Sequence, residues 1–343
     1  MPASPDHLQL SLMIRGFQVS RMLRLVGDLA IADGLSADGE CSVSDLAAAS
    51  SVHATPLLRV LRTLSSVGVF RVDATGRVSH TPMSLLLRRD AENSLHPAAV
   101  ALGAPGSWAA WNELDAALIG DVPYQRAWNT SRFEYLRDHP VEGRDFDRLM
   151  AQDPGNRHEA VATTYDFSGA ASIVDIGGGS GALLHKILAR NPDARGIVFD
   201  RADVVAAIAP DLLEAGRFAA VSGDFFEGVP AGADLYLLVR VLHDWPDDDC
   251  IRILRICRSA MRADSRLLVV EQILEPDPAK GRPLDYLGDM QMMAMFGSAR
   301  ERTRAEFDAL LEGAGFASTR VISTVSSASI VEAEPRATTA FGA

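Results

Sequence analysis

A histidine that follows an apolar strand is the strongest catalytic candidate in this sequence. His243 lies in the run Leu242-His-Asp-Trp-Pro, after a strand expected over Asp234–Val241 and before a helix expected near Pro246. Imidazole has an ordinary pKa near ~6.5, so it can accept and release a proton close to neutral pH. Because the carboxyl ends of strands face the ligand crevice of an α/β sheet, we predict that His243 is a general base.

A glycine-rich turn is the second candidate site. The segment Ile173-Val-Asp-Ile-Gly-Gly-Gly-Ser-Gly-Ala is typical of a buried strand that runs into a turn and then a helix. Glycines let the backbone turn sharply and a ligand approach closely, and the N-terminus of the following helix favours an anionic group. Taken alone the pattern is ambiguous, because Gly177, Gly179 and Ala182 also satisfy the dinucleotide fingerprint.

Three acids favour S-adenosylmethionine over a dinucleotide. Asp175 ends the first strand, close to where the pyrophosphate of a dinucleotide would have to lie. Asp200 and Asp224 end the next two strands, and these carboxyl ends converge on one crevice at a topological switch point. We therefore expect Asp200 to bind the ribose hydroxyls, Asp224 and Phe225 to bind the adenine, and the glycine turn to meet the methionine portion.

Alternating strands and helices position these residues from Ala171 onward. The expected strands are Ser172–Ile176, Gly196–Asp200, Ala219–Gly223, Asp234–Val241, Leu267–Ile273, Arg320–Thr324 and Ser329–Glu332. Helices between most of them imply right-handed crossovers and a parallel sheet. The last two strands are only a few residues apart, so they predict an antiparallel hairpin at the sheet edge. The expected fold class is α/β and Rossmann-like, with a mostly parallel seven-stranded sheet.

The N-terminal part has the pattern of a winged helix. Its expected helices cover 8–35, 42–50 and 55–67, and its hairpin covers 69–72 and 77–80. The first helical stretch is apolar over more than one face, so we expect a partner surface to cover it. A winged helix can bind DNA through its second helix, but here that helix offers only Arg59 and Arg62, and the chain carries a net charge of −12. We therefore expect dimerisation or substrate covering, and no nucleic-acid binding.

Length and composition indicate a globular protein of two domains. The chain has 343 residues, of which 48% are hydrophobic and 23% charged. The expected bounds are 1–95 for a dimerisation domain, 96–165 for a helical segment that covers the substrate, 166–335 for the cofactor-binding domain and 336–343 for a frayed tail. Charged residues interrupt the N-terminal apolar run, the start lacks a secretory pattern, and three cysteines form no disulfide or metal pattern. We expect a cytoplasmic protein without membrane contact.

Five motifs, in order along nearly the whole chain, resemble those of a known enzyme family. They are Asp175–Gly181, Gly223-Asp-Phe-Phe-Glu, Leu242-His-Asp-Trp, Val270-Glu-Gln and Arg300-Glu-Arg-Thr-x-x-Glu-Phe. Together they resemble the plant-type O-methyltransferases, which include caffeate and hydroxyindole methyltransferases and bacterial enzymes that tailor aromatic polyketides and antibiotics. The resemblance implies a homodimer with a Rossmann-like methyltransferase domain behind a winged-helix dimerisation domain. It also implies methylation of a hydroxyl, most simply a phenolic one, on a small aromatic metabolite.

The resemblance also assigns roles in the catalytic site. It makes His243 the base, with Glu271 and Glu301 flanking the ring and holding it in position. A phenol has a pKa near ~10, so at neutral pH it needs help to lose its proton. The lysine that plant members often carry four residues before the histidine is Val239 here, and Arg240 follows it. Bacterial relatives commonly carry arginine at this place, so Arg240 is a candidate cofactor contact.

The aromatic acceptor is expected to lie against a methionine-rich helix. Asp289, Met292, Met293 and Phe296 share one helix face, a stripe that is equally typical of a buried core. In the resembled family this helix lines the acceptor pocket, and methionine adapts well to flat ligands. The helical segment that should cover the pocket contributes Trp108, Phe146 and Met150.

Other functions are left open by these motifs. The acids Asp244, Asp247, Asp248 and Asp249 could suggest a metal, but acids in the first turn of a helix are favoured by its dipole, with Pro246 expected at the first helical position. We therefore expect no metal. The alternatives to methyl transfer are a family relative that uses the cofactor for hydroxylation or decarboxylation, and a winged-helix regulator that senses S-adenosylmethionine.

Overall fold

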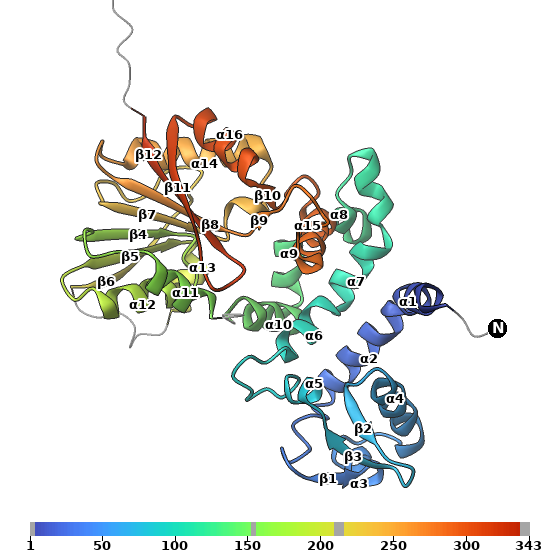
Figure 1. Ribbon diagram of the computed structural model, residues 1–343. Coiled ribbons are helices and arrows are strands. Elements are labelled where there is room, and N and C mark those ends of the chain that lie inside the picture. Colours follow the sequence, from blue (N-terminus) through green and yellow to red (C-terminus); the bar gives the residue numbers. More distant parts are fainter. Residues whose placement is uncertain (1–3, 152–155, 209–215, 337–343) are drawn as a thin grey trace, which may run out of the picture. The chain divides into compact units, whose positions relative to one another are not determined.

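The computed structural model describes residues 4–151, 156–208 and 216–336. It contains two compact units, one of Met1–Asn112 with Ala127–Gln152 and one of Glu113–Arg126 with Asp153–Ala343 (Figure 1). The helical segment expected over 96–165 is therefore divided between the two units. Apart from Arg336, the expected tail lies outside the described residues.

The first unit begins with a winged helix. Its helices are α1 (Pro5–Ile14), α2 (Gly16–Asp28), α3 (Val43–Ala49), α4 (Ala54–Ser66) and α5 (Pro82–Leu85), and its strands are β1 (Glu40–Ser42), β2 (Phe70–Val72) and β3 (Arg77–His80). The side chain of Ser42 caps α3 as expected. The short strand β1 was not predicted, because three residues are too few to show an alternating pattern. It pairs antiparallel with β3, so the sheet has the order β1-β3-β2.

The apolar face of the N-terminal helices is exposed within this single chain. The expected long helix is two helices, because Arg15 ends α1 and precedes α2. None of the residues of α1 is buried. Six large apolar side chains from α1 and the start of α2 are each more than half exposed: Leu8, Leu10, Leu12, Met13, Ile14 and Phe17. An exposed patch of this size is typical of an interaction surface.

Further helices complete the first unit and lead into the second. They are α6 (His96–Leu102), α7 (Pro105–Asn112), α8 (Pro123–Trp128), α9 (Arg132–Asp138) and α10 (Pro140–Ala151), with the short 3₁₀ helix η1 (Leu114–Ile119) between α7 and α8. Across the described ranges, no helix has both the length and the apolar character needed to cross a membrane.

The second unit is built on the expected seven-stranded sheet. Its strands are β4 (Ser172–Ile176), β5 (Arg195–Asp200), β6 (Phe218–Ser222), β7 (Leu235–Val239), β8 (Arg266–Glu271), β11 (Phe316–Ser323) and β12 (Ser329–Pro335). Their order is β11-β12-β8-β7-β4-β5-β6. The pairs β4–β5, β4–β7, β5–β6 and β7–β8 are parallel, whereas β12 is antiparallel to β8 and β11. The predicted fold class and edge hairpin are confirmed.

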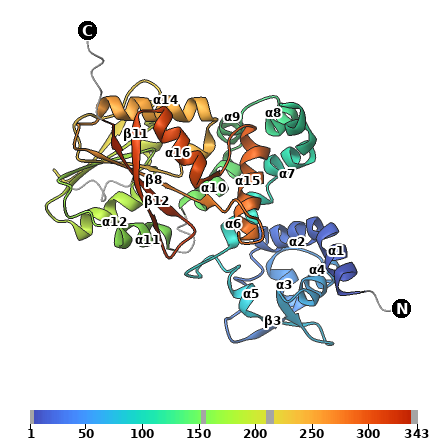
Figure 2. The same ribbon diagram turned by 45° about the horizontal axis from the view of Figure 1, so that its top comes forward.

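Helices cover both faces of this sheet (Figures 1 and 2). The helices α14 (Asp247–Ala260) and α16 (Arg304–Gly313) pack on one face, and α11 (Arg157–Thr164) and α12 (Ala182–Arg190) on the other. Successive residues of a strand point to opposite faces. In β8, Leu267 and Val269 accordingly join the core under α14 and α16, while Leu268 and Val270 join the core under α11 and α12. The helices α13 (Ala202–Ala206) and α15 (Pro283–Phe296) complete the described part of the unit.

One expected strand is split directly after Glu271. The strand predicted over Leu267–Ile273 ends at Glu271, where its antiparallel pairing with β12 also ends at Ser329. The chain then leaves the large sheet, and β9 (Ile273–Leu274) pairs in parallel with β10 (Arg302–Thr303). This exchange of partners brings the chain around Glu271 next to the chain that begins α16.

Candidate active site

His243 lies in a short turn directly beyond β7. The chain leaves β7 through Arg240, whose φ of 56° is in the left-handed region that non-glycine residues rarely occupy. The turn continues into the 3₁₀ helix η3 (Leu242–Asp244), and His243 in its middle is 4% exposed. A left-handed residue with a large side chain costs conformational free energy and is held by its surroundings. His243 is thus presented by a buried and constrained turn.

Two carboxylates lie against one nitrogen of the histidine. Nδ1 of His243 is 3.2 Å from Oε1 of Glu301 and 3.4 Å from Oε2 of Glu271. Both glutamates are buried, with exposures of 0% for Glu271 and 3% for Glu301. The other oxygen of Glu271 accepts hydrogen bonds from the backbone N–H groups of Val241 and Leu242, at 3.0 and 2.9 Å. The structure therefore brings together the three residues that the sequence placed in the catalytic site.

Charge around His243 sets where its proton resides. Burial and the Arg240 cation lower the pKa of His243, but the Asp244 and Glu271 carboxylates outweigh them and raise its pKa to about 10. Burial raises the pKa of Glu271. Burial also raises the pKa of Glu301, but hydrogen bonds and charge from His243 and Arg240 lower that pKa overall. In this structure the proton shared by the cluster belongs on the imidazole near neutral pH.

Asp244 has a different place from the one expected. It was grouped with Asp247, Asp248 and Asp249 as an acid of the first helical turn, and that grouping is wrong. Pro246 is the N-cap of α14 and not its first residue, and Trp245 before it is extended, so only the later three acids belong to the helix. Oδ1 of Asp244 instead lies 3.2 Å from Nε2 of His243.

Arg240 is bound to the carboxylate of Glu301. Its Nη1 donates to Oε1 of Glu301 at 3.0 Å, the oxygen that also faces His243. The side chain of Arg240 is 30% exposed, so it is not sealed away from a ligand. The expected contact of Arg240 with the cofactor stays a prediction.

The catalytic cluster has a spacing that could also hold a metal. His243, Glu271 and Glu301 each offer one ligand atom, and these atoms lie within 4.8 Å of one another. The positive charge of Arg240 and the proton on His243 already balance these carboxylates. The expectation that no metal is required stays a prediction, and a chelator tests it.

The glycine turn has the backbone that its sequence indicates. Gly177, Gly179 and Gly181 have φ values of 68°, 56° and 75°, which favour glycine. A Cβ on Gly181 would lie 2.5 Å from the ring of Phe218, whereas a Cβ on Gly179 would meet no described atom within 4 Å. The turn is therefore packed against the protein at Gly181 and open at Gly179, where a ligand can approach.

Two of the three predicted acids meet at this turn. Oδ2 of Asp200 accepts a hydrogen bond from the backbone N–H of Gly179 at 2.9 Å. Asp175 is 1% exposed, and among the described residues nothing donates a hydrogen bond to its Oδ1. Burial, together with the nearby Asp200, raises the pKa of Asp175 to about 7. An unpaired buried carboxylate oxygen beside an open turn fits a ligand that carries N–H or O–H donors.

The third acid forms the turn after β6. Oδ1 of Asp224 accepts from the backbone N–H of Phe226 at 2.8 Å, and Asp224 is exposed. Phe225 is half-buried, with its ring edge-on to that of Trp245 at 5.9 Å between centroids. An exposed carboxylate next to an aromatic face is suited to a flat heterocycle with an amino group, which is the predicted adenine contact.

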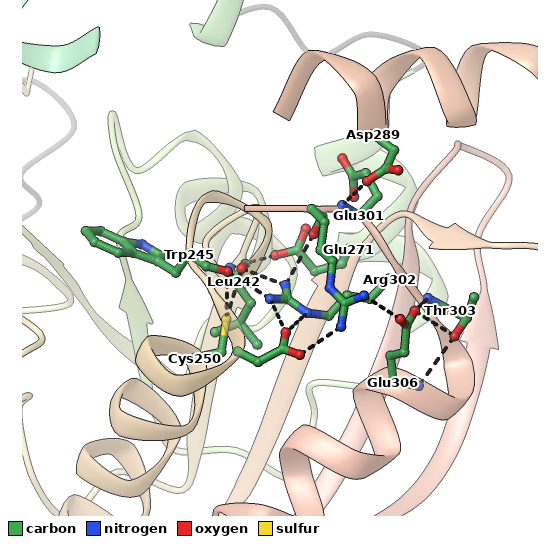
Figure 3. Close-up of polar contacts among 11 residues, drawn as sticks. Leu242, Trp245, Cys250, Glu271, Asp289, Glu301, Arg302, Thr303 and Glu306 are labelled. Carbon is green, nitrogen blue, oxygen red and sulfur yellow. Dashed lines mark hydrogen bonds and ion pairs between the residues drawn. The ribbon is translucent and has the colours of Figure 1, made fainter. Parts of the chain in front are cut away.

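The predicted acceptor face of α15 is not the buried face of that helix. Met292, Met293 and Phe296 are half-buried, whereas Ala294 and Met295 are buried. The acceptor-binding role of Met292, Met293 and Phe296 stays a prediction. Asp289, predicted with them, accepts a hydrogen bond from the backbone N–H of Glu301 at 2.9 Å and so touches the catalytic cluster (Figure 3).

The residues expected to cover the acceptor belong to the first unit. Trp108 lines an open pocket of about 540 Å³ together with Phe17, Met22, Gln18, Arg21 and Thr63. Phe146 is half-buried under the guanidinium of Arg132, which lies 4.9 Å from its ring centroid. Met150 is 53% exposed. The covering role of Trp108, Phe146 and Met150 stays a prediction.

Sequence reasoning missed one buried residue beside the site. Arg302 is 0% exposed and binds the main chain on both sides of His243. Arginine is rarely buried completely, so nothing in its type or spacing indicates such a place. The available signal was its position, next to Glu301 in the motif Arg300-Glu-Arg-Thr.

Comparison with known proteins places the chain in a family. Residues 111–317 match the O-methyltransferase domain, and residues 11–90 match the O-methyltransferase dimerisation domain. A phenazine O-methyltransferase from Lysobacter antibioticus is 41% identical over 329 residues, which cover 94% of each chain.

Solved structures agree over the whole length. A mitomycin 7-O-methyltransferase, 34% identical, superposes with a TM-score of 0.89 over 97% of this chain and 98% of that one. An O-methyltransferase of neocarzinostatin biosynthesis, solved with S-adenosylmethionine and 2-hydroxy-5-methyl naphthoic acid, is 32% identical with a TM-score of 0.79, covering 92% and 95%. The family resemblance is confirmed, and the regulator and the hydroxylating or decarboxylating relative gain no support. The chain belongs to the S-adenosylmethionine-dependent O-methyltransferases that carry an N-terminal dimerisation domain.

Proposed function

We propose that this enzyme methylates a phenolic hydroxyl of a small aromatic metabolite, with His243 as the general base. The observation that carries the proposal is a buried imidazole whose Nδ1 lies 3.2 Å from Glu301 and 3.4 Å from Glu271. When bound, S-adenosylmethionine supplies an electrophilic methyl group on a sulfonium sulfur and leaves as S-adenosylhomocysteine. The chain must then bind the acceptor, orient its oxygen and remove its proton.

His243 accepts the proton of the acceptor at Nε2. Because its pKa is raised to about 10, only the neutral fraction of His243 can accept a proton near neutral pH. In that fraction the two glutamates at Nδ1 favour the tautomer that carries its proton there, which leaves the lone pair on Nε2. Once the proton arrives, Asp244 at 3.2 Å from Nε2 and the glutamates stabilise the imidazolium. The pKa of His243 is raised to about 10, close to the ~10 of a phenol, so transfer of a proton from the phenol to neutral His243 is nearly balanced. Forming the neutral imidazole costs about 1.4 kcal/mol for each pH unit below its pKa.

The cofactor is held at the carboxyl ends of β4, β5 and β6. Asp200 binds the ribose hydroxyls, since its carboxylate stands at the open Gly179 and each oxygen can accept a second hydrogen bond. Asp224 and Phe225 bind the adenine amino group and ring face. The unpaired Oδ1 of Asp175 accepts from a donor of the bound cofactor.

The acceptor is a flat aromatic molecule. The half-buried Met292, Met293 and Phe296 of α15 form an adaptable apolar face. Relatives are named for phenazine and dihydroxy-naphthoate substrates, which are fused aromatic ring systems. Trp108, Phe146 and Met150 cover the acceptor, and the exposed apolar face of α1 and α2 is buried in a homodimer.

Replacement of His243 tests the proposal. His243→Ala should lower turnover by about 10²–10⁴-fold and leave S-adenosylhomocysteine affinity nearly intact, because only proton removal is lost. Because the pKa of His243 is also about 10, wild-type turnover should rise with pH over the same range, and the defect should shrink only above the pKa of the acceptor, where phenolate forms without help. Methylation of a phenol library with a labelled methyl donor measures turnover and identifies the acceptor class at the same time.

Two controls separate this role from others. His53→Ala removes an exposed histidine at the start of α4 and should leave turnover unchanged. Chelator should not alter the wild-type rate. Full activity of His243→Ala near neutral pH would move the base elsewhere, and loss of activity to chelator with rescue by magnesium would assign the cluster to a metal.

A further inference from the structure

Arg302 is a fully buried cation with every donor in use. Its exposure is 0%, and a guanidinium has five N–H donors in a rigid fork. Nε and Nη2 donate to Oδ1 of Asp247 at 3.0 and 2.8 Å, Nη2 also donates to the carbonyl of Trp245 at 2.8 Å, and Nη1 donates to the carbonyls of Leu242 and Arg300 at 2.8 and 3.2 Å (Figure 3). Five hydrogen bonds thus reach four oxygen atoms, and this pairing offsets the cost of burying the charge.

These contacts bracket the catalytic histidine. Leu242 directly precedes His243, and Trp245 follows it by two residues. The N–H of Leu242 donates to Glu271 at 2.9 Å while its carbonyl accepts from Arg302 at 2.8 Å. The main chain of Leu242, the residue before His243, is therefore held between the buried carboxylate of Glu271 and the buried guanidinium of Arg302.

Hydrogen bonding to the carbonyls of Leu242 and Trp245 does not by itself require an arginine. The thiol of Cys250 already lies 3.1 Å from the carbonyl of Leu242 and 3.3 Å from that of Trp245. A thiol is a weak donor with no fixed fork, whereas the planar guanidinium sets the distance and angle between both carbonyls. What the arginine adds is a fixed geometry of the turn.

We propose that Arg302 is a positioning residue for methyl transfer. It fixes the main chain on both sides of His243, so that Nε2 meets the acceptor hydroxyl in the reactive geometry. This inference rests on the proposed role of His243 as the base. A misplacement of about 1 Å from a residue outside the chemistry can cost about 10²-fold in rate, so removal of the guanidinium should lower kcat by about 10–100-fold.

The test is a double-mutant cycle in the full-length enzyme with a phenolic acceptor. Arg302→Met should lower kcat by about 10–100-fold, leave the KM for S-adenosylmethionine unchanged, and lose less at a pH above the pKa of the acceptor, where phenolate needs no base. His243→Ala/Arg302→Met should be no slower than His243→Ala alone, because both changes remove the same proton transfer. Arg302→Lys retains the charge but not the planar fork of donors, so its kcat should lie between those of wild type and Arg302→Met.

A matched control accounts for lost stability. Tyr236→Phe removes a buried hydroxyl that contacts the carbonyls of Pro230 and Ala260. It should lower the unfolding midpoint without changing kcat or its pH profile. The inference is overturned if Arg302→Met and Arg302→Lys keep wild-type kcat per folded molecule, if only the cofactor KM rises, or if the double variant multiplies both single losses. Wild-type activity of His243→Ala would instead refute the role of the base itself.

Discussion

Replacement of Glu271 by glutamine isolates the charge of this residue from its shape. Oε1 of Glu271 accepts from the backbone N–H groups of Val241 and Leu242, and Oε2 lies 3.4 Å from Nδ1 of His243. In Glu271→Gln only the amide oxygen can accept the two backbone bonds. The amide NH₂ group must then face His243.

Two effects of this change act on the rate in opposite directions. Two unit charges 3.4 Å apart attract by about 5 kcal/mol at an effective dielectric constant of about 20. This is an upper bound, because burial raises the pKa of Glu271 and reduces its charge. Loss of the attraction lowers the pKa of His243, which increases the neutral fraction near neutral pH.

The opposing effect is on the tautomer. An NH₂ donor at Nδ1 favours the proton on Nε2, where the acceptor's proton should go. In serine proteases, forcing the wrong tautomer of the catalytic histidine costs about 10⁴-fold. Here Glu301 at 3.2 Å still accepts from Nδ1, so we expect a smaller loss of about 10²-fold, below that of His243→Ala.

The two effects can be separated by the pH profile of kcat/KM. In Glu271→Gln the ascending limb should move to lower pH, and the plateau should lie about 10²-fold below that of wild type. Glu312→Gln, an exposed glutamate paired with Arg336, is the matched control and should change neither. A plateau at or above the wild-type level would refute tautomer control by Glu271. An ascending limb that stays at its wild-type pH would show that Glu271 does not raise the pKa of His243.

The remaining predictions concern stability and cofactor binding. The pKa of His243 is raised from 6.5 to about 10, so the folded protein holds a proton that the unfolded chain releases. Its contribution to the unfolding free energy should be fully present below pH 6.5 and lost as the pH rises towards 10, by at most about 1.4 kcal/mol per pH unit. The unfolding free energy, measured by denaturant titration at several pH values, should depend less steeply on pH in His243→Ala than in wild type. An equal pH dependence in the two proteins would disprove the assignment. Asp200→Ala should weaken S-adenosylhomocysteine binding by about 1–3 kcal/mol in calorimetry, and undiminished affinity would remove Asp200 from the cofactor site.

The parallel half of the second unit was predictable because its signals are local. β4 has the predicted bounds, and β5 and β6 differ by one residue at one or both ends. Each of these strands is a short, mainly apolar run with an acid at its end or within two residues of it, namely Asp175, Asp200 and Asp224. The run indicates the strand, and the acid indicates where a polar side chain emerges. The positive φ values of Gly177 and Gly179 follow from residue type.

The contacts around His243 depend on tertiary structure and were not predictable in this way. The split between β8 and β9 follows from where the pairing with β12 ends, and the residue type of Gln272 does not indicate it. Asp244 turns towards His243 because the extended Trp245 separates it from α14. The burial of Arg302 requires two carbonyls and Asp247 to converge, which no spacing along the chain shows.

Arg240 shows how the site limits the strength of its own base. Asp244 and Glu271 raise the pKa of His243, and with Glu301 they surround the ring with negative charge. Without a compensating cation the imidazole would hold its proton more tightly, and less of it would be neutral at physiological pH. Arg240 donates to Glu301 at 3.0 Å and lowers the pKa of both Glu301 and His243. The left-handed backbone of Arg240, with φ of 56°, thus places a cation beside the acids. In the proposed mechanism this cation lowers the pKa of His243, so that more of the imidazole is neutral and can accept the proton of a phenol.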